Sequence, residues 1–166
     1  MLQLKKFTFN PFAENTFVLF DETKESIVID PGCYEKAEQH ELVDFIETNK
    51  LAVKKLINTH CHIDHVLGNA FVKRKFNVQL YIHTIKEPLL RAVSSYASNY
   101  GFQQYEDSTP DAFLQEDGFV EFGNQKLKIL FVPGHSPGHI ALYDAAGKIL
   151  LGGDVLFENS IGRSDL

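Results

Sequence analysis

The first third of the chain alternates apolar and polar residues in short runs separated by turn residues. A period of two is typical of β-strands that bury one face. The pattern predicts three successive strands, at residues 2–9, 15–20 and 26–30. The third run closes on Asp-Pro-Gly at residues 30–32, which is a strong turn signal. We therefore predict a meander of three strands at the start of the fold.

The middle of the chain changes to a helical spacing, in which apolar residues recur every three or four positions between charges. Thr84 is a plausible N-cap and Gly101 a plausible end for the last of these patterns. Shorter β-type runs lie between the helical ones. The predicted helices are residues 34–50, 66–76 and 84–101, and the predicted strands between them are residues 53–59 and 77–83.

The last third returns to strands after a polar, turn-rich segment at residues 102–118, which we interpret as a surface excursion. The predicted strands are residues 126–134, 139–147 and 148–154, and a hairpin through DAAGK joins the last two. Strands, then alternating strands and helices, then strands again suit a sandwich of sheets with helices outside. A chain of 166 residues is expected to form one compact unit.

Composition narrows the classes of function. The net charge is −6 and no block of Lys or Arg occurs, so the basic surface of a nucleic-acid-binding protein is missing from the sequence. No apolar run is long enough to cross a bilayer, and the N-terminal residues carry charges where a signal peptide is apolar. Cys33 and Cys61 form no Cys-x-x-Cys pair. We expect a cytoplasmic protein with reduced thiols and no membrane partner.

The segment LINTHCHIDHVLG, residues 56–68, places three histidines and an aspartate within six positions. Core packing does not explain this cluster, because protonated imidazoles would repel one another, whereas a metal ion would explain it. In an extended segment alternate side chains face the same way, so His60 and His62 can bind one ion. Asp64 and His65 follow where the chain turns into a helix and can hold a second ion. Such ligands are compatible with zinc, iron or manganese.

Further ligands are expected at the ends of later strands. His135 follows a strand and a Pro-Gly turn in VPGHSPGH, and Asp154 ends the apolar run ILLGGD. Asp30 also ends a strand, and we expect it to orient a metal-binding loop from behind the ligands. The same alternation turns Cys61 away from the ion, so we expect a buried, inert thiol there.

These motifs resemble those of a known family. HCHIDH matches the His-x-His-x-Asp-His signature of the metallo-β-lactamase-fold hydrolases, and DPG, PGHSPGH and GGD match further motifs in the same order. The segment FENSIGRSDL is similar to the glyoxalase II branch, the hydroxyacylglutathione hydrolases. The resemblance covers nearly the whole chain. It implies an α+β fold, an αββα sandwich of two mixed sheets with helices on the outer faces, formed by residues 1–166 as a single domain.

The resemblance also implies residue roles. The first metal would be held by His60, His62 and His135, and the second by Asp64 and His65, with Asp154 bridging them. Asp64 would orient the nucleophile as the catalytic residue, while His139 is not a ligand in the family. The implied activity is hydrolysis of a small-molecule thioester by metal-bound hydroxide, with Zn²⁺ as cofactor in up to two sites.

One departure bears on the second site. The family carries a further histidine well downstream of the bridging aspartate, whereas this chain ends twelve residues after Asp154. We therefore expect a C-terminally truncated domain, whose second site is weakly occupied on these residues alone. Two other functions stay open, together with the oligomeric state. One is a persulfide dioxygenase with a single iron on His60, His135 and Asp154, and the other is an inactive metal-binding module.

Overall fold

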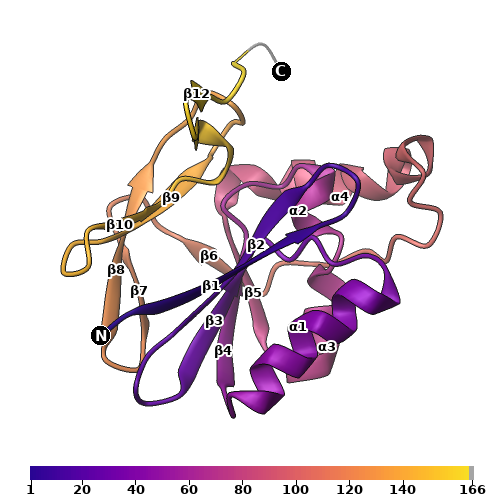
Figure 1. Cartoon of the computed structure of the whole chain (residues 1–166). Helices are drawn as coiled ribbons and strands as arrows, with labels where there is room; N and C mark the ends of the chain where they lie inside the picture. Colours follow the sequence, from indigo (N-terminus) through magenta and orange to yellow (C-terminus); the bar gives the residue numbers. More distant parts are fainter. Residues whose placement is uncertain (165–166) are drawn as a thin grey trace.

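A computed structural model describes residues 1–164 as two β-sheets that pack face to face, with helices on one side (Figure 1). Asp165 and Leu166, the end of the FENSIGRSDL segment, lie outside the described residues. None of the described helices is both long and apolar enough to cross a membrane.

The first sheet contains six strands in chain order. They are β1 (Gln3–Phe9), β2 (Glu14–Phe20), β3 (Glu25–Ile29), β4 (Ala52–Ile57), β5 (Gln79–His83) and β6 (Ala112–Leu114). Strands β1 to β3 pair antiparallel through tight turns, which confirms the predicted meander. Strands β3 to β6 pair parallel, because β4, β5 and β6 are each reached by a crossover that contains a helix.

The helices differ from the prediction at their ends. They are α1 (Lys36–Thr48), α2 (Ile63–Val66), α3 (Asn69–Phe76) and α4 (Glu87–Tyr96), with 3₁₀ turns η1 (Thr84–Lys86) and η2 (Ala97–Tyr100). The predicted cap at Thr84 is wrong, because Thr84 is already helical and the His83 Nδ1 accepts the Ile85 N–H at 3.4 Å. Gly101 ends the segment in the left-handed region at φ 91°, as predicted.

The second sheet has the order β10-β9-β8-β7. Its strands are β7 (Phe119–Phe122), β8 (Gln125–Phe131), β9 (Ile140–Asp144) and β10 (Ile149–Leu151). Both sheets were expected to be mixed, but all described pairs of this one are antiparallel, since hairpins or short loops join its strands. The turn η3 (Gly153–Val155) and a hairpin of β11 (Leu156–Phe157) and β12 (Ser160–Ile161) follow.

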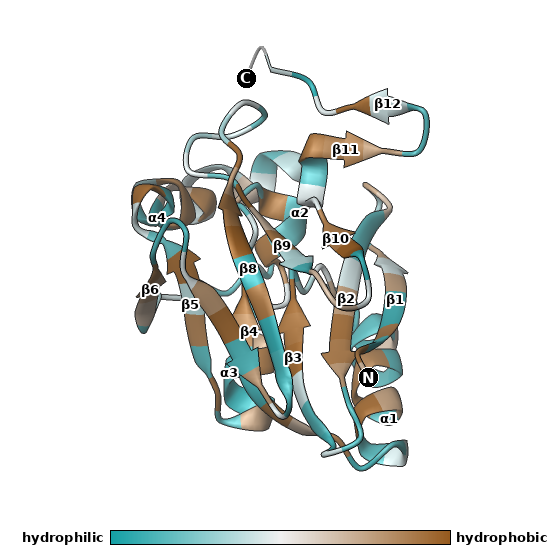
Figure 2. Ribbon diagram, turned by 90° about the vertical axis from the view of Figure 1, so that its left-hand side faces the viewer, coloured by the Kyte–Doolittle hydropathy of each residue, from teal (hydrophilic) through white to brown (hydrophobic). Residues whose placement is uncertain are grey.

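The core has two layers, because successive residues of the first sheet face opposite ways. Figure 2 shows that the strands of both sheets are largely hydrophobic. Val28 packs toward the helices, and its neighbours Ile27 and Ile29 pack toward the second sheet. Buried residues of all four helices, such as Ile46 and Leu90, belong to the first layer. The predicted α+β sandwich is confirmed. Within residues 1–164 its helices cover the first sheet, and no described helix covers the outer face of the second.

The polar segment at residues 102–118 is more than a surface excursion. It contains β6, which pairs with the edge of β5, and the Asp111 carboxylate accepts the Leu80 N–H at 2.7 Å. Phe102 and Leu114 are buried. Three strand residues next to charges carry no periodic signal, so the sequence pattern missed a strand that the sheet edge selects.

Candidate metal centre

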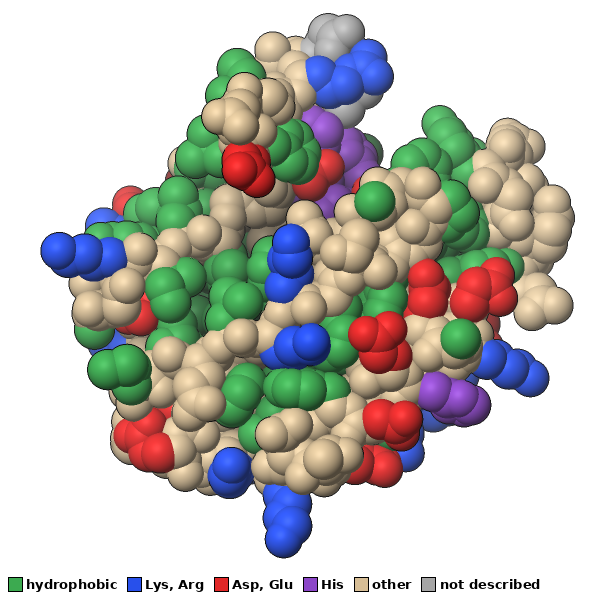
Figure 3. Space-filling model, viewed as in Figure 1, with side chains coloured by type: hydrophobic (Ala, Val, Ile, Leu, Met, Phe, Trp, Pro, Cys, Tyr) green, Lys and Arg blue, Asp and Glu red, His purple; other side chains and the backbone are tan. Residues whose placement is uncertain are grey.

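The proposed ligands come from both sheets and meet at one end of the sandwich. His60 and His62 follow β4, and Asp64 and His65 lie in α2. His135 lies in the loop between β8 and β9, and Asp154 lies in η3 after β10. Figure 3 shows histidine and acidic side chains in a hollow at this end of the molecule. The structure thus places all six predicted side chains in one cluster.

Three imidazoles form one half of the cluster, which we call the imidazole half. The ligand nitrogens of His60, His62 and His135 all lie within 4.8 Å of one another. The His135 Nε2 is 3.0 Å from the His62 Nδ1. Tetrahedral zinc with Zn–N bonds of 2.0–2.1 Å separates its ligand nitrogens by about 3.3 Å. This spacing fits a shared cation.

A relay of hydrogen bonds fixes the tautomer of His60. The Thr59 hydroxyl donates to the Asp30 Oδ2 at 2.5 Å, so its oxygen is free to accept the His60 Nδ1–H at 3.2 Å. The His60 Nε2 therefore carries a lone pair, which is buried and has no hydrogen-bond partner. A buried acceptor without a partner is costly. A metal ion at this position would satisfy it, so the residues fit the cofactor that the sequence implies.

Burial keeps His60 and His62 uncharged. It lowers the pKa of His60 well below the ordinary value, and the neighbouring imidazoles His65, His139 and His62 lower it further. Burial, followed by the charge of His135, lowers the pKa of His62 to about 4. Both rings are neutral at pH 7 and present lone pairs, as metal ligands must.

Two aspartates surround His65 in the other half, which we call the carboxylate half. The His65 Nε2 lies 3.4 Å from an Asp64 oxygen and 3.3 Å from the Asp154 Oδ1. The other Asp154 oxygen, Oδ2, lies 3.6 Å from the His135 Nε2 and 4.0 Å from the His60 Nε2. One carboxylate therefore faces both halves of the cluster.

Charge separates the two halves. Burial alone would lower the pKa of His65, but the carboxylates of Asp154 and Asp30 outweigh it and raise that pKa well above the ordinary value. Burial raises the pKa of Asp64. Burial would also raise the pKa of Asp154, but its contacts with His65 lower it. Without metal, the His65 imidazolium thus provides the positive charge between these carboxylates.

Asp30 and Glu14 lie behind His65. The Asp30 carboxylate accepts the Thr59 N–H at 2.7 Å and the Thr59 hydroxyl, and its Oδ2 lies 3.2 Å from the His65 Nδ1. Asp30 is close enough to be a ligand, but with both oxygens engaged it suits an orienting role. Glu14 was not singled out in the sequence. It is 4% exposed, and burial raises its pKa to about 9.

Three other residues, His139, Lys86 and Ser136, support the cluster, and the sequence did not indicate this role for them. The His139 Nδ1 donates to the Ile140 carbonyl at 3.0 Å, and the His139 Nε2 accepts the Asp154 N–H at 3.3 Å. Lys86 is fully buried, and its Nζ donates to the Ser136 Oγ at 2.6 Å, next to His135. Only the PGHSPGH motif pointed to this region, and it did not reveal these contacts. Cys61 lies in the first core layer, as the alternation predicted.

Comparison with known proteins supplies the wider context. The family model of the metallo-beta-lactamase superfamily matches residues 9–166. Hydroxyacylglutathione hydrolase GloC of Haemophilus influenzae is 32% identical over 156 residues, which cover 93% of this chain and 72% of that protein. The crystal structure of the BLEG-1 B3 metallo-beta-lactamase matches with a TM-score of 0.86 at 29% identity, covering 99% of this chain and 78% of that one. TTHA1623 in a di-iron-bound form matches at 0.82 and 31% identity, covering 98% and 77%.

Proposed function

The chain belongs to the metallo-β-lactamase superfamily, and on that premise we propose that it hydrolyses thioesters, in particular hydroxyacyl esters of a low-molecular-weight thiol. One observation carries most of the support. The two oxygens of Asp154 face different halves of the cluster, Oδ2 toward His60 and His135 and Oδ1 toward His65. A carboxylate in that position suits a pair of cations better than a single one.

The metal would be held in two places. The imidazole half would hold one cation and the carboxylate half a second, with zinc as the proposed metal. Bound cations would supply Lewis acidity, which makes hydroxide available at neutral pH and polarises the thioester carbonyl.

We also propose a cytoplasmic location for the protein, because both cysteines are free and buried.

The side chains at the site orient the attacking water and present lone pairs to the metal. Asp64 lines the cavity beside the cluster, where its carboxylate accepts a hydrogen bond from the attacking water and directs the water's lone pair. Neutral His60 and His62 keep their lone pairs available across the physiological pH range. The leaving thiolate is stable enough to depart without a strong acid, so the absence of Lys and Arg from the described lining of that cavity is no obstacle.

The test removes one proposed ligand at a time, first from the side of the first sheet and then from the side of the second. His60→Ala and Asp154→Asn should each lower bound zinc and thioester turnover together, by at least 100-fold in kcat/KM, while far-UV circular dichroism stays unchanged. His135→Ala should behave in the same way. His40→Ala, at an exposed histidine of α1, is the matched control and should retain both. Full turnover in a variant that has lost its metal would contradict the proposal.

A second candidate is oxygen-dependent chemistry on a single iron, and one observation favours it. The His60 Nε2 and the His135 Nε2 lie 4.0 Å and 3.6 Å from the Asp154 Oδ2, and two imidazoles with one carboxylate are the ligand set of many non-haem iron oxygenases. Protein loaded with iron should then consume oxygen in the presence of a persulfide. The dinuclear hydrolase instead predicts a second, more weakly bound metal equivalent and no oxygen uptake.

A further inference from the structure

A cavity of about 630 Å³ opens directly beside the cluster. Its walls come from the β1–β2 loop, from α2 and from the end of α4 and η2. The lining residues are Phe12, Ile63, Tyr96, Asn99 and Tyr100, together with the proposed ligands His62 and Asp64. A molecule in this cavity therefore has one end at the reacting centre.

Two of the three aromatic rings that line this cavity are exposed to solvent, whereas Tyr96 packs against the core. Phe12 is 50% exposed and Tyr100 is 57% exposed. The Phe12 and Tyr100 ring centroids are 6.1 Å apart, and those of Tyr96 and Tyr100 are 5.9 Å apart with an edge-to-face angle of 73°. Exposed apolar surface that is held together in this way is typical of a binding site.

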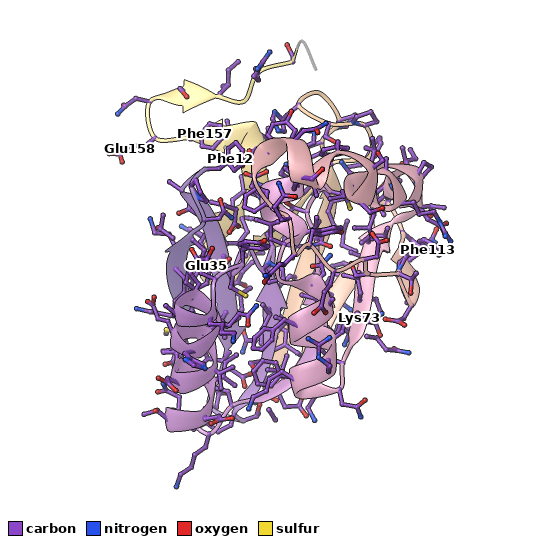
Figure 4. The ribbon with its side chains drawn as sticks, turned by 90° about the vertical axis from the view of Figure 1, so that its right-hand side faces the viewer. Phe12, Glu35, Lys73, Phe113, Phe157 and Glu158 are labelled. Carbon is purple, nitrogen blue, oxygen red and sulfur yellow. The ribbon has the colours of Figure 1, made fainter. Side chains whose placement is uncertain are left out.

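Asn10 fixes the Phe12 turn relative to the cluster. Its Nδ2 donates to the backbone carbonyls of Gly32 and Asp64, both at 3.0 Å, and its Oδ1 accepts the Phe12 N–H at 3.0 Å. One side chain thus ties the aromatic wall to the helix that carries a proposed ligand. In Figure 4, Phe12 lies at the same end of the molecule as Phe157, and Phe113 lies toward another edge. The wall is preorganised with respect to the reacting centre.

Away from the proposed metal ligands, the lining suits an apolar group better than an anionic one. No lysine or arginine lines the cavity among the described residues, and Asp64 adds a carboxylate. The carboxylates of a glutathione moiety would find no cation there, whereas an aryl or alkyl group would bury its surface against the rings.

We propose that this cavity binds an apolar substituent of the acyl group, so that the preferred substrates are thioesters of 2-hydroxy acids with an aryl or alkyl side chain. This inference rests on the proposed thioester hydrolysis. Phe12 and Tyr100 would determine acyl specificity through contact with that substituent, while the reacting carbonyl lies at the cluster.

The experiment uses the full chain loaded with zinc and thioesters of N-acetylcysteamine, whose thiol is neutral. Phenyllactoyl and lactoyl esters differ only in the phenyl ring, and kcat/KM should favour the former at least tenfold. Phe12→Ala and Tyr100→Ala should each reduce this ratio about tenfold, and Tyr100→Phe should preserve it. Phe113→Ala, at a 41% exposed aromatic residue of β6, is the matched control.

A binding measurement separates the two proposals. S-(2-phenylethyl)-N-acetylcysteamine, a thioether that lacks the thioester carbonyl, should quench tyrosine fluorescence saturably in the wild type and not in Phe12→Ala. The chain contains six tyrosines and no tryptophan, so the signal reports on residues such as Tyr96 and Tyr100. Hydrolysis without acyl preference would overturn the cavity assignment alone. Saturable binding without any thioester hydrolysis would overturn the proposed function and leave the apolar cavity standing.

Discussion

The two sides of the candidate metal centre are held in different ways. On the side from the first sheet, residues 58–65, His60 and His65 are buried, at 0% and 3% exposure, while His62 and Asp64 are half-buried. Asp30 bonds Thr59, and the Asn58 Nδ2 donates to the His65 carbonyl at 3.1 Å. On the side from the second sheet, the Asp154 side chain is 24% exposed. The contacts of that side include those of His139 and Lys86 and the one between the His135 Nδ1 and the Arg163 carbonyl at 3.1 Å.

This difference indicates that the two sides of the centre contribute to metal binding in different ways. The first side is a continuous segment whose tautomers and orientations are set by buried neighbours, so it is preformed without metal. The second side brings its groups from separate loops, so their position depends on how the two sheets pack. Zinc affinity should therefore respond to changes on both sides, but most strongly where one residue orients several ligands.

The largest effect is expected for Asp30→Asn. The amide would donate to the Thr59 hydroxyl, which would then donate to the His60 Nδ1 and move the ring proton to Nε2, where a ligand lone pair is needed. Zinc affinity should fall about 10- to 100-fold, and the free energy of unfolding should fall by about 2 kcal/mol. Competition with a zinc chelator and urea denaturation would measure these effects. Asp44→Asn, on the exposed face of α1, is the control. Unchanged zinc affinity would refute the relay.

A smaller effect is expected for His139→Leu on the second side. Leucine fills the space but cannot accept the Asp154 N–H, so Asp154 loses the hydrogen bond that anchors its backbone. We expect about tenfold weaker zinc binding, together with a loss of about 1 kcal/mol in stability. His139→Gln retains an acceptor and should recover part of both. Equal defects in the two variants would argue that packing, not this hydrogen bond, is what matters.

The smallest effect on zinc, about threefold, is expected for Lys86→Met, because Lys86 acts on His135 only through Ser136. The pH dependence of the free energy of unfolding is a more specific test of Lys86. Burial lowers the pKa of Lys86 from 10.5 to about 8. Between these values the unfolded chain binds a proton that the folded chain does not, so Lys86 adds about 3 kcal/mol of stability as pH rises through that window.

Urea denaturation at pH 7.5 and pH 10.5 would measure this contribution as the difference between wild type and Lys86→Met. The stability of the variant relative to the wild type should fall as the pH rises. Lys36→Met, at an exposed lysine of α1, should show no such change. A difference that is independent of pH would mean that Lys86 is not buried as a cation.

The sequence by itself determined the elements and the ligand types. Period-two and helical spacing marked the main strands and helices, since those periods follow from backbone geometry. The HCHIDH segment identified the first side of the centre, because its ligands are neighbours along the chain and alternation alone decides which of them face together. His135 and Asp154 were recognised from short motifs at strand ends.

Only the tertiary structure decided how the two sides meet. No local period encodes contacts between residues far apart in sequence. Examples are the pairing of β6 with β5, the Lys86–Ser136 hydrogen bond and the His139 contact with Asp154. The burial of Glu14 likewise depends on which segments pack around it. The same holds for the cavity that Phe12 and Tyr100 line, because most of the first sheet and its helices lie between these two residues along the chain. Backbone preferences act over a few residues, whereas burial, tautomers and hydrogen-bond partners depend on which segments pack together.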